Sequence, residues 1–201
     1  IFLHTENNRR FNASTGGNNR AKQGSGVIPR WAMGAGYTGS MLGSPANILI
    51  TESYLKGITD FDAETALKYM KNSSEKATER ENRDHIELYN EYGYIPEDKA
   101  PDDESVSRTI EYSWEDAAIA SLAQALGYEE DYEKYSSKAA YYKNVFDTDT
   151  KYFRARNSDG SFTWNFNPSM NTFYDMVMIK KFASAYCEGS ARQWRWSATH
   201  D

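Results

Sequence analysis

The sequence has one cysteine, Cys187, and no apolar run near the ~20 residues that a helix needs to cross a bilayer. A single cysteine excludes a disulfide within the chain, so cysteine content indicates no particular compartment. Basic residues are fewer than acidic ones, 23 against 29, which gives a net charge of −6. Nucleic-acid partners require a basic surface. We therefore expect neither a nucleic-acid partner nor a membrane span. The N-terminus also lacks the basic start and apolar core of a signal peptide.

Recognisable motifs of several enzyme classes are missing as well. The sequence contains no phosphate-binding or dinucleotide-binding glycine motif and no Ser-His-Asp arrangement. Its three histidines form no His-Glu-x-x-His pattern. The acidic runs at 97–98 and 102–104 lack the spacing of an EF-hand loop and are interpreted as solvated surface. Sequence pattern therefore assigns no metal ligand.

Aromatic residues, in contrast, are plentiful, with 15 tyrosines, nine phenylalanines and five tryptophans. The last sixteen residues combine Glu188, Gln193 and Trp196 with a final His200–Asp201 pair. Carboxylates transfer protons, indoles stack on sugar rings, and amides and imidazoles hydrogen-bond hydroxyls. This mixture favours a carbohydrate substrate. The alternative is the start of an amphipathic helix whose tryptophans fill a core.

Apolar periodicity in the middle of the chain is helical. The strongest signal runs from Ser105 to Leu126, where apolar residues recur at three- and four-residue steps until Gly127. Short connections favour antiparallel neighbours, so an all-α fold is expected. Further helices are predicted between Ser44 and Gly57, from Asp62 onward, from Ile86 to Gly93, over Asp131–Phe146 and over Tyr174–Tyr186.

Charged residues within these helices have simple interpretations. The stretch from Ser74 to Asp84 is predicted either to continue a helix in solvent or to form a loop. Glu111 and Asp116 lie near Arg108 on one helix, which favours an ion pair on the helix surface.

A turn is predicted at 157–161, where turn-forming residues follow one another. Arg154 and Arg156 precede it and either line a pocket or support the turn. Trp31 follows a proline in a glycine-rich segment, and contact with a sugar and packing in a core remain open for it.

Several short blocks stand in a characteristic order along the chain: Ile28–Trp31, Tyr37–Asn47, Glu52–Asp62, Tyr92–Pro96, Glu104–Tyr112, Phe153–Ser161 and Tyr186–Asp201. Together they resemble glycoside hydrolase family 92, the calcium-dependent exo-α-mannosidases. The resemblance covers about Val27 to Asp201. In the last block Glu188 matches, while Arg192 and Thr199 replace a tryptophan and a proline.

The resemblance implies part of an (α/α)6 barrel, with about six of its twelve helices present. On this resemblance, the family's N-terminal β-sandwich and C-terminal helices are expected to lie outside residues 1–201. Residues 1–26 are an irregular, unmatched segment, and 27–201 are a partial catalytic domain. The partner that completes the barrel is the remainder of the same polypeptide, so residues 1–201 alone are expected to be inactive.

The activity implied is that of an inverting exo-α-mannosidase, acting on α-1,2-linked mannose of N-glycans or mannan. Glu188 matches the general acid, and the base lies outside this chain. Calcium is the implied cofactor, with ligands that cannot be assigned here, and the implied location is extracellular or periplasmic. The substrate-binding residues implied or favoured by residue type are Trp31, Arg154, Gln193, Trp196, His200 and Asp201.

A second hypothesis is a non-catalytic helical domain derived from the family and used for glycan binding or assembly. The replacements at Arg192 and Thr199 favour it, as does Asn47, which stands at a position often acidic in relatives.

Overall fold

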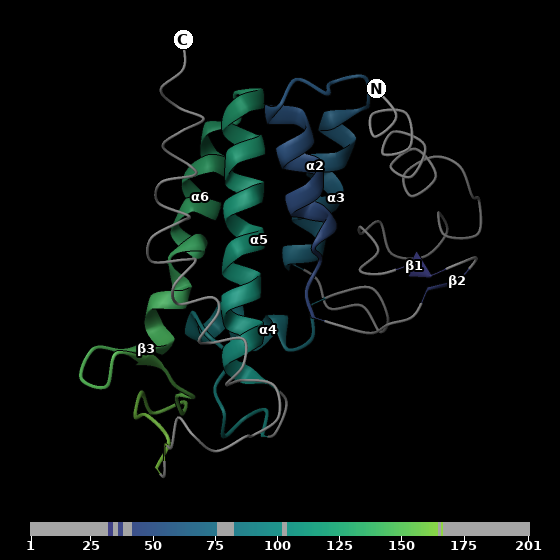
Figure 1. Ribbon diagram of the computed structural model, residues 1–201. Coiled ribbons are helices and arrows are strands. Elements are labelled where there is room, and N and C mark those ends of the chain that lie inside the picture. Colours follow the sequence, from purple (N-terminus) through teal and green to yellow (C-terminus); the bar gives the residue numbers. More distant parts are fainter. Residues whose placement is uncertain are drawn as a thin grey trace.

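The computed structural model describes residues 32–33, 36–37, 42–75, 83–101, 104–164 and 166. This part of the chain is mostly helical, which confirms the expected fold class (Figure 1). Two antiparallel hairpins pair β1 with β2 and β3 with β4. The elements are β1 (Ala32–Met33), β2 (Gly36–Tyr37), α2 (Ala46–Leu55), α3 (Ala63–Glu75), α4 (Ile86–Tyr92), α5 (Ser105–Leu126), α6 (Glu129–Ala139), the 3-10 helix η2 (Tyr141–Val145), β3 (Phe146–Asp147) and β4 (Tyr152–Phe153).

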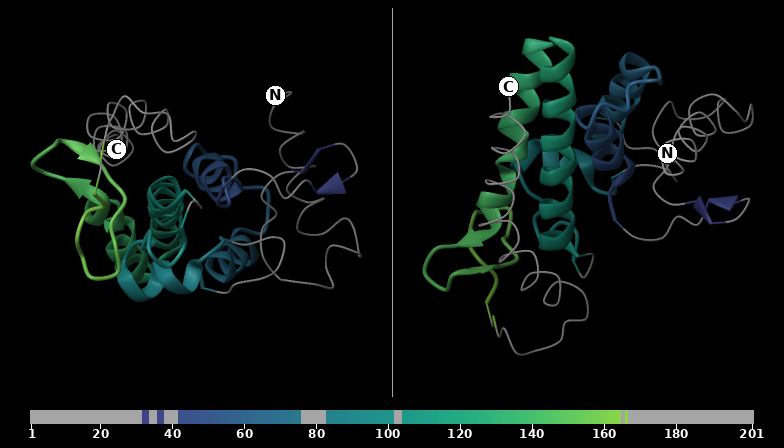
Figure 2. Two further views of the ribbon diagram at one scale, coloured as in Figure 1. Left: turned by 90° about the horizontal axis from the view of Figure 1, so that it is seen from below. Right: turned by 45° about the horizontal axis from the view of Figure 1, so that its top comes forward.

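Helix α5 is the centre of this arrangement. It stands between α6 on one side and α2 and α3 on the other, and α4 lies near its lower end (Figures 1 and 2). The largest core cluster joins α2, α3 and α5 through Ile50, Leu67, Met70, Ile119 and Leu122, all buried, and reaches α6 through Tyr135. Burial of such side chains contributes roughly 1.5–3 kcal/mol each. Because neighbours surround α5, it is buried on most of its faces.

The ends of the helices follow from local sequence. Asp62 caps α3, since its Oδ1 accepts the Thr65 backbone N–H at 2.9 Å. Gly93 and Gly127 end α4 and α5 in left-handed backbone conformations, with φ of 74° and 83°. The bounds predicted for α5 are confirmed. Ser44 precedes α2 but contributes its backbone carbonyl, which accepts the Asn47 N–H at 2.9 Å, and not its side chain.

The helix predicted to run to Phe146 ends early, so that prediction is wrong in its second half. Helix α6 stops at Ala139, η2 follows, and Phe146 is already in β3. The Arg154 backbone N–H donates to the Val145 carbonyl at 2.8 Å, which turns the chain into the β3–β4 hairpin. Val145 is buried against Phe153 in a second core cluster. The turn at 157–161 is confirmed, closed by Asn157 N–H donating to the Ser161 carbonyl at 2.8 Å.

Candidate functional site

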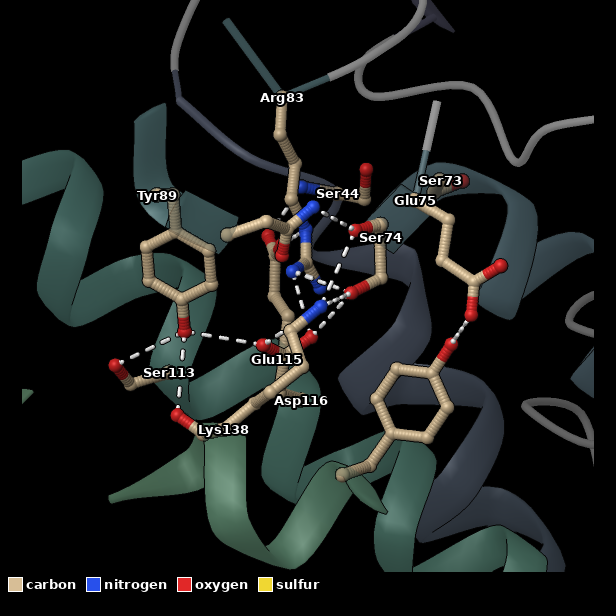
Figure 3. Close-up of polar contacts among 12 residues, drawn as sticks. Ser44, Ser73, Ser74, Glu75, Arg83, Tyr89, Ser113, Glu115, Asp116 and Lys138 are labelled. Carbon is tan, nitrogen blue, oxygen red and sulfur yellow. Dashed lines mark hydrogen bonds and ion pairs between the residues drawn. The ribbon is translucent and has the colours of Figure 1, made fainter. Parts of the chain in front are cut away.

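A buried charged network lies against the middle of α5, with Asp116 at its centre (Figure 3). Oδ1 of Asp116 accepts hydrogen bonds from Arg83 Nη1 at 2.6 Å and from Ser74 Oγ at 2.8 Å. Oδ2 accepts one from the Tyr89 hydroxyl at 3.0 Å and lies 3.8 Å from Lys138 Nζ. The network thus joins α3, the segment before α4, α4, α5 and α6 through one carboxylate.

Arg83 links Asp116 to its neighbour Glu115. Its Nε lies 2.8 Å from Glu115 Oε2, and both side chains are fully buried. The guanidinium carbon also lies 5.2 Å from the centre of the Tyr112 ring. Burial opposes the charged form, but the Asp116 and Glu115 carboxylates outweigh it and raise the pKa of Arg83. Arg83 is therefore held as a cation.

Lys138 of α6 supplies the second cation. Its Nζ donates to Ser74 Oγ at 2.6 Å and to the Ser74 carbonyl at 3.2 Å. The ammonium lies 5.7 Å from the centre of the Tyr89 ring and 5.3 Å from that of Tyr135. Burial lowers the pKa of Lys138 to about 8, although Asp116 counteracts this effect.

Two carboxyl groups one turn apart on α5 face the segment that precedes α2. Glu115 Oε1 accepts a hydrogen bond from the backbone N–H of Ser44, and Glu111 packs against Gly43. Burial raises the pKa of both glutamates, an effect that Arg83 opposes. Glu111 is the partly exposed member of this pair.

The network links the helices to one another. Its central charged groups are bonded within the protein, so they are not available for a reaction. Asp116 uses both oxygens for bonds to the protein, so neither oxygen is free to reach a substrate. Arg83 and Lys138 face the Asp116 carboxylate, and Arg83 also faces the Glu115 carboxyl group, which satisfies the requirement that buried charges be paired. Through the bond from the Ser44 N–H to Glu115, the network thus fixes the position of the start of α2.

Two interpretations made from the sequence concern this network, and the first of them is wrong. Asp116 is not in a surface ion pair with Arg108. Arg108 instead pairs with Asp84, with 2.6 Å between Nη1 and Oδ2, and with Glu104, with 3.9 Å between Nη2 and Oε2. Of the two alternatives for the stretch from Ser74 to Asp84, continuation of a solvated helix does not fit its ends, because α3 stops at Glu75 and both Ser74 and Arg83 are completely buried. Residues 76–82 lie outside the described residues, so the loop stays a prediction. In both cases a partner distant in sequence compensates the buried polar group.

Arg154 is the one predicted substrate-binding residue that the structure describes. Its Nη1 lies 2.6 Å from Asp147 Oδ2, and its Nη2 donates to the Thr163 carbonyl at 2.8 Å. The guanidinium also packs over the rings of Phe162 and Phe166. Bonding by Arg154 and Thr150 lowers the pKa of Asp147. These contacts support the hairpin, and binding of a substrate by Arg154 stays a prediction.

The other predicted site residues lie outside the described residues: Trp31, Glu188, Gln193, Trp196, His200 and Asp201. The helix expected over Tyr174–Tyr186 and the irregular segment 1–26 also lie outside them.

Sequence reasoning missed Ser74, Tyr89 and Lys138 as members of one network. A usable signal was the composition of α5, which carries small or apolar residues on nearly every face. A helix of that kind is buried all round, so acidic residues within it need buried partners.

No group of three or more His, Cys, Asp or Glu side chains within the described ranges is arranged to hold a metal ion. Calcium prefers several oxygen ligands, so this part of the chain does not fit the calcium that the resemblance implies. No described helix is long and apolar enough to cross a membrane.

Comparison with known proteins gives consistent results. The chain is 30% identical over 169 residues to an uncharacterised secreted glycosidase of Arthroderma benhamiae, covering 76% of this chain and 21% of that protein. A family 92 α-mannosidase of Bacteroides thetaiotaomicron, solved with mannoimidazole, is similar with a TM-score of 0.73 and 32% identity, covering 82% of this chain and 21% of that one. An inverting mannosidase of family 92 from the same organism gives a TM-score of 0.69 and 29% identity, covering 78% of this chain and 21% of that one.

The chain thus spans about a fifth of the length of these relatives. A model of the glycosyl hydrolase family 92 catalytic domain matches residues 3–201, nearly the whole sequence. The described helices are accordingly part of a helical catalytic domain, and the chain belongs to glycosyl hydrolase family 92.

Proposed function

We propose that the polypeptide containing this chain is an inverting exo-α-mannosidase with Glu188 as its general acid. The observation that carries the proposal is the family match over residues 3–201, together with the likeness to an α-mannosidase solved with mannoimidazole. The inverting outcome is supported by the similar inverting mannosidase. We propose α-1,2-linked mannose of N-glycans or mannan as the substrate.

An inverting glycosidase needs an acid and a base whose carboxyl groups are ~6.5–9.5 Å apart, with a water between the base and the sugar. Glu188 would protonate the departing glycosidic oxygen. Proton donation near neutral pH requires that burial or a neighbouring anion raise the pKa of Glu188. The base belongs to a part of the polypeptide outside residues 1–201.

The remaining parts of the proposal concern binding and location. Trp31 and Trp196 would stack on the sugar, and Arg154, Gln193, His200 and Asp201 would bind its hydroxyls. We propose calcium dependence for the polypeptide as a whole, with ligands outside the described residues. The similar secreted glycosidase supports an extracellular or periplasmic location.

The test is hydrolysis of α-1,2-mannobiose by the full polypeptide that contains residues 1–201, followed by NMR of the released sugar. We expect β-mannose as the first product, because inversion changes the anomeric configuration. Release of α-mannose would reject the inverting mechanism. Binding of the disaccharide with no hydrolysis, with and without calcium, would instead favour the second function below.

The second function is a non-catalytic helical domain for glycan binding or assembly. It is favoured by Arg192 and Thr199, which depart from the family's signature beside Glu188. Loss of a tryptophan and a proline there changes the surface around the carboxylate while the carboxylate itself is kept.

A further inference from the structure

Unpartnered polar atoms gather where α2 begins. Within the described residues, the fully buried side-chain atoms without a hydrogen-bond partner are Ser44 Oγ, both amide atoms of Asn47, Arg83 Nε and Nη2, Glu115 Oε2 and Arg154 Nε. Arg83 Nε and Glu115 Oε2 face each other in their ion pair at 2.8 Å. Apart from Arg154 Nε, four unpartnered atoms then remain: Ser44 Oγ, the two amide atoms of Asn47, and Arg83 Nη2.

These three residues are connected, Asn47 to Ser44 directly and Ser44 to Arg83 through Glu115. The Asn47 backbone N–H donates to the Ser44 carbonyl at 2.9 Å. The Ser44 N–H donates to Glu115, and Glu115 binds Arg83. Figure 3 shows Ser44, Glu115 and Arg83 next to one another. The residues that carry the unpartnered atoms are therefore linked to one another around the start of α2.

A buried polar group without a partner costs roughly 1–3 kcal/mol. Folded proteins keep few such groups, and each calls for an explanation such as a bound ligand. Four unpartnered atoms around one helix start, in an otherwise satisfied network, indicate that a further group completes their hydrogen bonds.

The chemistry of these atoms defines that group. Arg83 Nη2 and the Asn47 amide nitrogen are donors, the Asn47 oxygen is an acceptor, and the Ser44 hydroxyl is both. A hydroxyl also donates and accepts, whereas a carboxylate or a cation satisfies only one kind. Arg83 already has the carboxyl groups of Glu115 and Asp116 as partners, which further favours a neutral ligand.

We propose that the start of α2 binds a hydroxyl group, with Ser44, Asn47 and Arg83 as its hydrogen-bond partners. The hydroxyl comes either from a sugar or from an internal water. Glu111, which packs against the same Gly43 backbone as Glu115, is partly exposed, so it is the nearest of the network's acidic residues to solvent. The sugar source rests on the proposed function, but the site itself does not.

The experiment compares Asn47→Leu with wild type in the full polypeptide, since leucine has the branched shape of asparagine without its polar atoms. Asn144→Leu is the matched control, because the Asn144 amide has a known partner, the Gly93 carbonyl at 2.9 Å. Two quantities are measured: the melting temperature without ligand, and the affinity for methyl α-mannoside by calorimetry.

A sugar source predicts that Asn47→Leu weakens methyl α-mannoside binding about tenfold or more, since each lost hydrogen bond contributes about this factor. An internal water predicts unchanged sugar affinity but a melting temperature lowered at least as much as in Asn144→Leu. Unchanged affinity with an equal or higher melting temperature would overturn the proposal, because removal of a truly unpartnered amide stabilises the fold.

A second pair of variants covers the case in which Asn47→Leu does not fold. Ser44→Ala removes a buried hydroxyl without a partner in the protein, and Ser73→Ala removes one that donates to the Tyr69 carbonyl at 3.1 Å. If a hydroxyl ligand is bound, Ser44→Ala lowers the melting temperature at least as much as Ser73→Ala. A neutral or stabilising Ser44→Ala would contradict the site. Neither measurement requires turnover, so failure of hydrolysis leaves the outcome interpretable.

Discussion

Gly43 lies directly against the carboxyl group of Glu115. A β-carbon at this position would overlap Glu115 Oε1 and would stand 2.9 Å from Glu111 Cγ. The Gly43 backbone also has φ of 63°, in the left-handed region that side chains disfavour. Glycine therefore allows the chain before α2 to approach α5 closely enough for Ser44 to donate its N–H to Glu115.

Replacement of Gly43 by alanine should destabilise the protein by about 2 kcal/mol or more, through backbone strain and displacement of Glu115. Gly57→Ala is the matched control, because Gly57 has φ of 86° but no atom within 4 Å of an added β-carbon. Urea unfolding of both variants separates strain from contact. An equal loss of stability in the two variants would show that the contact with Glu115 contributes nothing.

Removal of one charge from the network should lower the free energy of unfolding far more than removal of a surface charge. Asp116→Asn keeps the shape of the side chain but leaves Arg83 and Lys138 without their shared anion. We expect a loss of about 3–5 kcal/mol in the free energy of unfolding, as for other broken buried pairs. The control, Lys56→Met, removes the exposed pair with Glu52 and should change stability by less than about 1 kcal/mol. Comparable losses in the two variants would contradict this description of the network.

The lowered pKa of Lys138 predicts a specific dependence of stability on pH. The pKa is about 8 in the folded protein and 10.5 in its ordinary state. Between these values the unfolded chain binds more protons, so the free energy of unfolding gains a contribution that increases with pH. Below about pH 8 the buried ammonium imposes a constant cost. The difference in stability between wild type and Lys138→Met should therefore shift in favour of wild type from about pH 8 to 10.

Lys134→Met provides the control for that measurement, because Lys134 is an exposed lysine on the same helix, paired with Glu75. Chemical denaturation at several pH values between 7 and 10 gives, for each variant, the slope of the free energy of unfolding against pH. A slope in wild type that Lys138→Met leaves unchanged would assign the dependence to other groups, such as the buried tyrosines.

Local signals in the sequence were sufficient for most helix bounds. The apolar period and Gly127 define α5, Asp62 defines the start of α3, and Gly93 defines the end of α4. These features depend on residues within a few positions of one another. The end of α6 could not be predicted in this way, since it depends on pairing of Val145 with Arg154 in the hairpin.

The charged network could not be predicted for the same physical reason. Asp116 is 33 residues from Arg83 and 42 from Ser74, and Lys138 is 64 residues from Ser74. Spacing along a helix indicates neighbours three or four positions away, which led to the wrong pairing of Asp116 with Arg108. Burial of a charge depends on partners that only the tertiary fold brings together.

The last prediction concerns Glu188 as the general acid of the full polypeptide. Glu188→Gln keeps the shape and hydrogen-bonding reach of the side chain but removes the proton that it transfers. Hydrolysis of a mannoside with a poor leaving group should fall by roughly a hundredfold or more, the usual contribution of a positioned acid. An activated aryl mannoside needs less protonation of its leaving group, so its hydrolysis should fall much less. If Glu188 instead only stabilises a helix start, both substrates should lose activity equally and the melting temperature should fall. Kinetics with the two substrates, measured alongside thermal unfolding, therefore distinguish an acid from a structural residue, and equal losses with a lowered melting temperature would remove Glu188 from the mechanism.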